Sequence, residues 1–300
     1  MVDLPKFAVL MAAYNGMEWI EEQVRSILDQ KYVSVSLYIS VDESTDGTYA
    51  WCSEISRLDS RVVVLCPAGR FGGAAKNFFR LIRDVDFSVY DYVAFADQDD
   101  IWIDSKLISS HEAILDKNVY AYSANVTAFW PDGRQQLVDK AQKQRSYDFL
   151  FEAAGPGCSY TIKVSSMLKF KQVLVENRFN LDEVGLHDWL VYAWHRANGM
   201  SWYIDSVPRV LYRQHGGNQV GANFGLKSML ARIRLFRSGW YRTEVSKIAS
   251  VIIQDLPDVP KSVAYNGSLP RSFVIANFGK FRRRFRDRVV LVAFMFLGIY

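Results

Sequence analysis

The sequence of 300 residues has little cysteine, little histidine and no apolar run long enough to cross a bilayer. Its three cysteines, Cys52, Cys66 and Cys158, are odd in number and lack metal-site spacing. They therefore fit a reducing cytosol better than a disulfide framework. The apolar stretch at 289–300 has twelve residues, whereas a membrane-spanning helix needs about 20. The first five residues do not resemble a signal peptide.

Acidic side chains are scarce in the last quarter of the chain. From Gly225 to Tyr300 there are 14 Lys and Arg against 4 Asp and Glu, whereas the preceding residues hold 22 and 28. The acidic first part does not resemble a nucleic-acid binder, and the basic last part suits an anionic surface. With 50% hydrophobic residues and neither repeats nor low-complexity segments, the sequence predicts one sizeable α/β domain with an appendage.

Apolar runs that resemble strands alternate with amphipathic segments that resemble helices. The predicted strands are 7–13, 35–41, 61–65, 92–96 and 119–129, and the predicted helices are 17–30, 74–83 and 104–117. This alternation predicts a mostly parallel sheet with helices on both faces.

Three carboxylates follow the strand at 92–96. Asp97, Asp99 and Asp100 fall within four residues, so their charges repel one another unless a cation or hydrogen-bond donors compensate. Mg²⁺ or Mn²⁺ would do so and could also hold a diphosphate. The alternative is a solvated acidic turn, in which Asp104 caps the next helix.

Polar residues also follow the other predicted strands, at the sheet edge where a nucleotide would lie. Asp42 could accept hydrogen bonds from a base or ribose, or it could simply open a loop before a helix capped by Asp46. The glycine-bearing loop at 69–73 precedes Lys76, which lies in the first turn of its helix. That turn favours an anion, although Lys76 could equally be a solvated lysine.

The second half of the chain offers four further candidates. Gly157 lies in a glycine-proline loop that could let a sugar approach the backbone, or could be an ordinary turn. Asp188 lies at the start of a predicted helix, where it could act as a base or only cap the helix. Trp189 either stacks on a sugar or fills the core. His215, one of four histidines, suits a metal or diphosphate role or a buried structural one.

Several of these motifs, in order, resemble the family 2 glycosyltransferases. They are Ala13-Tyr14-Asn15-Gly16, the run at 42–48 and Asp97-Gln98-Asp99-Asp100, and the similarity covers about residues 6–221. The form Asp-Gln-Asp-Asp-Ile-Trp is similar to that of rhamnosyltransferases of bacterial surface polysaccharides. One departure is Arg70-Phe71-Gly72-Gly73, which lacks an asparagine that many relatives carry there.

The resemblance implies a GT-A fold, a nucleotide-diphosphate sugar as donor, a divalent metal (Mn²⁺ or Mg²⁺) and an inverting reaction. It makes Asp188 the catalytic base and Asp99 a metal ligand with help from His215, and it assigns Asp97 to the ribose or a metal-bound water. The residues assigned to the donor are Ala13, Tyr14, Asp42, Lys76, Asp97 and Gln98, and those assigned to the acceptor are Gly157 and Trp189.

We expect residues 1–224 to form the GT-A domain, with a nucleotide-binding part at 1–103 and an acceptor-binding part at 104–224. Residues 225–300 are expected to be helical, at 226–238 and 241–253, and to hold the protein peripherally on the inner face of the cell membrane. The run at 278–288, with six basic residues beside Phe281 and Phe285, suits an anionic leaflet. The alternative for this segment is a packing helix or a dimer contact.

The favoured function is transfer of L-rhamnose from dTDP-rhamnose to a lipid-diphosphate-linked oligosaccharide during synthesis of O-antigen, capsule or cell-wall polysaccharide. UDP-galactose, UDP-glucose or UDP-GlcNAc are alternative donors. A sugar-nucleotide pyrophosphorylase would need a glycine-rich, Arg-containing loop after the first strand, and only 13–16 stands there. A non-catalytic member of an assembly complex would not need Asp99, Asp188 and His215 together. The oligomeric state stays open.

Overall fold

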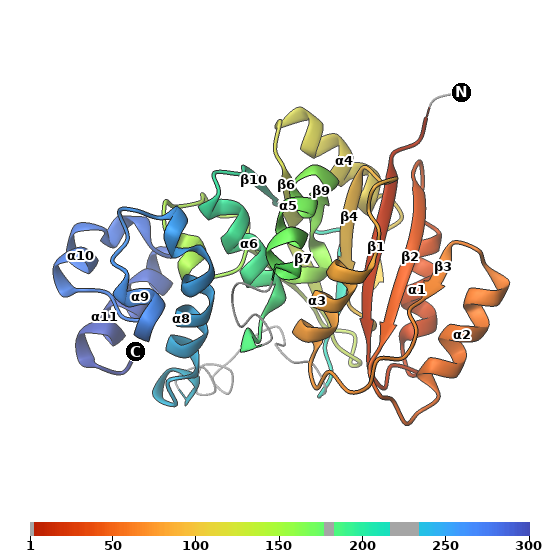
Figure 1. Cartoon of the computed structure of the whole chain (residues 1–300), viewed down its shortest axis with the longest axis horizontal. Helices are drawn as coiled ribbons and strands as arrows, with labels where there is room; N and C mark the ends of the chain where they lie inside the picture. Colours follow the sequence, from red (N-terminus) through yellow and green to blue (C-terminus); the bar gives the residue numbers. More distant parts are fainter. Residues whose placement is uncertain (1–2, 177–182, 217–233) are drawn as a thin grey trace.

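A seven-stranded sheet forms the centre of the protein (Figure 1). The computed structural model describes residues 3–176, 183–216 and 234–300. The strands lie in the order β10 (Trp202–Asp205), β6 (Ala121–Ala124), β9 (Thr161–Lys163), β4 (Tyr92–Ala96), β1 (Lys6–Ala13), β2 (Ser34–Val41) and β3 (Val62–Val64). Neighbouring strands are parallel except β9, which runs antiparallel to β4 and β6. The predicted α/β class with a mostly parallel sheet is confirmed.

The alternation of side chains along β1 explains why both faces of the sheet are covered. Ala8 and Leu10 lie in one buried cluster, and Val9 and Met11 lie in another on the opposite face. The first face packs against α3 (Ala74–Asp84), α5 (Val164–Val175) and α6 (His187–Ala197). The second packs against α1 (Ile20–Leu28), α2 (Thr48–Leu58) and α4 (Lys106–Asp116). Every β1 residue from Phe7 to Met11 is consequently buried.

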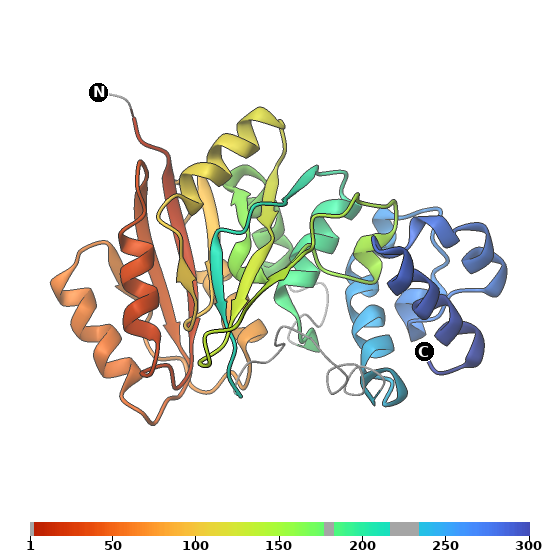
Figure 2. The ribbon, with the colours of Figure 1, turned by 180° about the vertical axis from the view of Figure 1, so that it is seen from behind.

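A smaller sheet lies beside the main one (Figure 2). Its strands are β5 (Ile101–Trp102), β11 (Val210–Arg213), β7 (Val126–Phe129) and β8 (Gln135–Val138). The prediction of a single strand over 119–129 is wrong, because the chain passes from β6 to β7 at Asn125. The Asn125 Oδ1 accepts hydrogen bonds from the backbone of Lys140 at 2.6 Å and Ala141 at 3.1 Å, and Nδ2 donates to the Ser206 carbonyl at 3.0 Å. One buried amide thus fixes the exchange between sheets.

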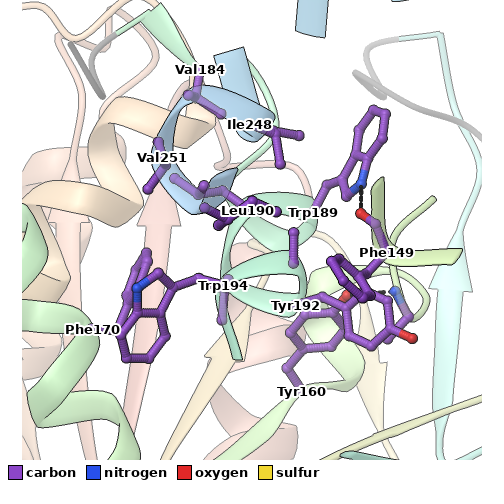
Figure 3. Close-up of a cluster of buried hydrophobic side chains, with 14 of the residues drawn as sticks. Phe149, Tyr160, Phe170, Val184, Trp189, Leu190, Tyr192, Trp194, Ile248 and Val251 are labelled. Atoms are coloured by element: carbon purple, nitrogen blue, oxygen red, sulfur yellow. Dashed lines mark hydrogen bonds between the residues drawn. The ribbon is translucent and has the colours of Figure 1, made fainter. Parts of the chain in front are cut away.

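The C-terminal helices lie at the end of the molecule opposite β3 (Figure 1). They are α8 (Trp240–Ile252), α9 (Ser262–Asn266), α10 (Arg271–Ala276) and α11 (Phe285–Leu297). Ile248 and Val251 of α8 pack with Leu190 of α6 (Figure 3). The same apolar cluster includes Leu291 and Tyr300. The predicted helix at 241–253 is confirmed as α8, whereas most of the one at 226–238 lies outside the described residues. No described helix is long and apolar enough to traverse a bilayer.

Part of the basic run at 278–288 is internal, which corrects the expectation that this run faces a membrane as a whole. The Arg283 side chain is fully buried and pairs with Asp148 at 3.2 Å and Glu152 at 3.5 Å. Arg282 lies 3.9 Å from Glu152, and Arg288 is buried and donates to the Arg282 carbonyl. These arginines join the C-terminal helices to the segment that contains Asp148 and Glu152, between β8 and β9.

Replacing Arg283 with methionine should therefore lower the free energy of unfolding by about 3–5 kcal/mol, because Asp148 and Glu152 lose a buried partner. Arg286→Met is the matched control. Its side chain is 75% exposed and pairs with the adjacent Asp287, so the change should be below about 1 kcal/mol. Urea denaturation of the full chain measures both. Equal losses in the two variants would show that the Arg283 pairs do not hold the C-terminal helices.

Candidate active site

The ends of β1 and β4 are joined by the side chain of Gln98. Its Oε1 accepts a hydrogen bond from the Tyr14 backbone N–H, and its Nε2 donates to the Tyr14 carbonyl, both at 2.8 Å. A Cβ on Gly16 would lie 2.4 Å from the Gln98 Oε1, so only glycine fits there. Because both polar atoms of its amide are occupied, Gln98 positions Tyr14, whose side chain is about half exposed, 51%. Ala13 is buried, and its carbonyl accepts the N–H of Asp42.

Asp42, which directly follows β2, holds the glycine-bearing loop at 69–73 in place. Its carboxylate accepts backbone N–H groups of Glu43 and Phe71 at 2.8 Å and of Gly72 at 3.0 Å. Gly72 adopts a φ of +73°, which disfavours any other residue. A carboxylate has about four acceptor sites, so capacity remains for a ligand. Lys76 is exposed in the first turn of α3, beside this loop.

The structure brings Asp99 and His215 together across 116 residues of sequence. The His215 Nε2 lies 2.7 Å from the Asp99 Oδ2, and the ring stacks on Trp19 with centroids 3.9 Å apart. Arg213 fixes the same region, because its Nε donates to the Asp99 carbonyl and its backbone N–H donates to Asp100. An imidazole and a carboxylate so placed can ligate a divalent cation such as Mn²⁺ or Mg²⁺.

The carboxylates at the end of β4 are too crowded to be ionised together. Burial, together with the charges of Asp99 and Asp188, raises the pKa of Asp97 to about 8. Burial also raises the pKa of Asp100 well above its usual value, again with help from its neighbours. A bound cation would reverse these shifts, so the residues fit a metal. Asp188 is among the groups whose charge acts on Asp97.

A second group of possible ligands consists of Asp97, Asp100 and Cys158, whose ligand atoms lie within 4.8 Å of one another. Burial raises the pKa of the Cys158 thiol well above its usual value, which keeps it protonated. A neutral thiol is a poor ligand for a hard cation. Asp99 and His215 are therefore the residues that could hold a divalent metal, and Cys158 is a neutral hydrogen-bonding group.

A buried lysine lies beneath the cluster and was missed by the sequence analysis. Lys106 is 1% exposed, and its Nζ lies 3.5 Å above the Trp102 ring. Burial lowers its pKa to about 7, opposed by the charges of Cys158 and Asp100. The available signal was its position on the inward face of α4, shared with Ser110 and Ile114. In its protonated form, Lys106 balances part of the negative charge of the carboxylate cluster.

Asp188 lies at the start of α6 and faces Gly157. A Cβ on Gly157 would lie 3.2 Å from the Asp188 Cβ and 3.1 Å from the His187 Nε2, so a side chain there would crowd the carboxylate. Burial raises the Asp188 pKa to about 6, and the Trp189 backbone N–H and Lys140 oppose the rise. Sequence reasoning also missed His187, whose ring stacks on Phe78 at 3.8 Å. Burial lowers its pKa to about 3, so this imidazole is neutral.

Trp189 is a core residue, which corrects its assignment to the acceptor. It is 3% exposed, its indole N–H donates to the Phe149 carbonyl at 2.8 Å, and its ring stacks on Tyr241 (Figure 3). A ring covered in this way cannot stack on a sugar. The alternative that the sequence left open, that Trp189 fills the core, is the one the structure supports.

The open α/β sheet, with ordered loops, a carboxylate cluster and Asp188 at one edge, has the GT-A glycosyltransferase fold. Among solved structures, S. aureus TarS 1-349 in complex with UDP-GlcNAc is similar, with a TM-score of 0.55, 13% identity, and 87% of this chain and 73% of that chain covered. The family model "Glycosyltransferase like family 2" matches residues 5–145.

Curated relatives extend the similarity to almost the whole chain. The dTDP-rhamnosyl transferase RfbG of Shigella flexneri is 43% identical over 97% of this chain and 100% of its own length. The Escherichia coli enzyme WfgD, a UDP-Glc:alpha-D-GlcNAc-diphosphoundecaprenol beta-1,3-glucosyltransferase, is 29% identical over 50% of this chain and 57% of its own. The chain belongs to the family 2 glycosyltransferases, as its motifs predicted.

Proposed function

We propose that the protein is an inverting rhamnosyltransferase that uses dTDP-rhamnose and acts on a lipid-diphosphate-linked saccharide in the synthesis of a bacterial surface polysaccharide. The observation that carries the chemistry is that Asp188 lies against Gly157, while the adjacent Cys158 has its ligand atom within 4.8 Å of those of Asp97 and Asp100. The full-length similarity to a dTDP-rhamnosyl transferase supports the donor, and the acceptor named for WfgD supports the lipid diphosphate.

The residues of the chain divide into a donor side and an acceptor side. Tyr14, Asp42 and Lys76 border the donor nucleotide, with Gln98 and Ala13 holding Tyr14 and Asp42 in place. Mg²⁺ or Mn²⁺, held by Asp99 and His215 with Asp97 nearby, would offset the negative charge that grows on the departing diphosphate.

Asp188 is the general base in a single displacement. It removes the proton from an acceptor hydroxyl while that oxygen bonds to the anomeric carbon and the bond from this carbon to the diphosphate breaks. Attack from the face opposite the diphosphate inverts the configuration. A pKa of about 6 leaves Asp188 ionised at neutral pH and still basic enough to accept the proton.

A membrane surface is the proposed location, on the cytoplasmic side. Phe285, Val289 and Phe296 of α11 follow one another at helical spacing and are 68%, 42% and 37% exposed. Arg286 and Lys280, also exposed, flank this face with positive charge. Exposed apolar side chains bordered by cations suit the interface of an anionic bilayer.

A donor assay with the purified full chain tests the function. With Mg²⁺ or Mn²⁺ and a sugar-diphosphate-lipid acceptor, dTDP should be released from dTDP-rhamnose faster than UDP from UDP-glucose, UDP-galactose or UDP-GlcNAc. Chelation or Asp99→Asn should abolish turnover, whereas Asp104→Asn, an exposed carboxylate paired with Lys31, should not. Full turnover with chelator would refute the metal role, and preference for a UDP-sugar would refute the donor.

The Asp188→Asn variant tests the base. General-base catalysis contributes about 10²–10⁴-fold, so kcat should fall by that factor while KM for the donor changes little. In the wild type at saturating metal, kcat/KM should fall about tenfold per pH unit below pH ~6, because only the ionised carboxylate accepts the proton. A variant within a few-fold of the wild type would assign the proton transfer to another group.

Vesicle co-sedimentation tests the membrane face. Phe285→Ser with Val289→Ser should weaken binding to anionic vesicles at least tenfold, and salt should weaken wild-type binding. Tyr265→Ser is the matched control, because Tyr265 is 82% exposed on α9. Point variants are preferable to truncation, which would remove the buried Phe281 and Leu291. Unchanged binding together with an altered oligomeric state would make this face a contact between copies.

A further inference from the structure

We propose that Lys140 and Arg284 form the subsite for the diphosphate of the acceptor, between the catalytic base and the apolar face of α11. This inference rests on the proposed lipid-diphosphate acceptor and assigns its anionic group to two residues that the family motifs do not include.

Lys140 lies beside the catalytic base. Its Cγ would be 3.7 Å from a Cβ on Gly155, in the same short loop whose Gly157 faces Asp188. Its charge acts on Asp188 and lowers the pKa of that carboxyl against the effect of burial. The lysine is half-buried, with its backbone N–H fixed by Asn125. A cation is therefore anchored next to the position of the reacting hydroxyl.

Arg284 continues the positive charge from Lys140 toward α11. Its Nη2 donates to the carbonyl of Asp139, the residue before Lys140, at 2.6 Å and to the Asp139 carboxylate at 3.1 Å. The same two segments meet again where the Tyr147 N–H donates to the Lys280 carbonyl. In Figure 2 the segment between β8 and β9 reaches across to the C-terminal helices. Lys140 and Arg284 thus belong to one continuous surface.

The neighbouring arginines do not compete for this role. Arg283 and Arg288 are buried, and Arg283 is paired with Asp148 and Glu152. Arg284 differs, because its side chain is 39% exposed and its partner Asp139 is 43% exposed. An exposed ion pair contributes little to stability, so an incoming anion can exchange for Asp139 at low cost. A guanidinium also binds phosphate oxygens in a two-pronged geometry.

The order of these groups on the protein matches the order of groups in the proposed acceptor. Asp188 receives the sugar hydroxyl, Lys140 and Arg284 follow, and Phe285, adjacent to Arg284 in the chain, begins the exposed apolar face. A saccharide, a diphosphate and a lipid are joined in the same sequence. The lipid would enter the bilayer at α11 while its diphosphate is neutralised just outside it.

Two soluble acceptors that share one saccharide test the subsite: a saccharide-diphosphate-alkyl compound and the corresponding alkyl glycoside without phosphate. The measured quantity is the ratio of kcat/KM for the first to kcat/KM for the second, with purified full chain at fixed donor and metal. Wild type should prefer the diphosphate, and this preference should decrease with salt. Lys140→Gln and Arg284→Gln should each reduce it about tenfold.

Two control variants test whether the effect depends on positive charge at this subsite. Arg284→Lys should recover part of the preference, since charge is retained, and Lys169→Gln, an exposed lysine on α5, should leave the ratio at the wild-type value. Thermal unfolding of every variant checks folding. A ratio unaffected by Lys140→Gln and Arg284→Gln, in an enzyme that prefers the diphosphate acceptor, would refute the subsite alone. Turnover of dTDP-rhamnose without transfer to either acceptor would instead refute the proposed acceptor class.

Discussion

Electrostatic repulsion at the end of β4 is the constraint on which the rest of the site depends. Asp99 and Asp100 are buried and Asp97 is half-buried, yet all three lie at the end of the strand beside β1 in the main sheet. Each neighbouring element supplies a group that reduces this cost: Lys106 from α4, the backbone N–H of Arg213 and the ring of His215 at the end of β11. The proposed Mg²⁺ or Mn²⁺ would offset the remaining charge of this cluster and that of a nucleotide diphosphate.

Hydrogen bonds between polar side chains and the backbone, rather than apolar contacts, fix the loops around this cluster. The Gln98 amide fixes Tyr14, the Asp42 carboxylate fixes Phe71 and Gly72, and the Asn125 amide fixes Lys140. Each side chain binds a segment far away in sequence, so the loops at the sheet edge are positioned before any ligand arrives. Such preorganisation matters in a transferase, because charge that develops in the transition state is stabilised best by groups that need not move.

The sequence was sufficient wherever the signal was local. Short apolar runs predicted β1, β2 and β4, and the motifs predicted a shared role for Asp99 and His215, which the structure places 2.7 Å apart. The sequence was insufficient where the burial of a residue depends on partners that are distant in the chain. The strand at 119–129 looked continuous because Asn125 acts through Lys140 and Ser206, which local patterns do not reveal. Trp189 looked available to a sugar because the Phe149 carbonyl and Tyr241 that cover it are distant in sequence.

The basic run near the C-terminus shows the same limit most clearly. From Phe281 to Arg284 exposure alternates, with Phe281 and Arg283 buried and Arg282 and Arg284 partly exposed. The backbone is extended at both ends of this short stretch, so successive side chains point to opposite sides. Composition alone suggested a uniform cationic patch. The alternation instead divides it into arginines that anchor the C-terminal helices to Asp148 and Glu152 and an arginine that faces outward beside Lys140. Stability and proposed acceptor binding thus depend on adjacent residues of one segment, which explains how α11 can be held at a fixed position relative to Asp188.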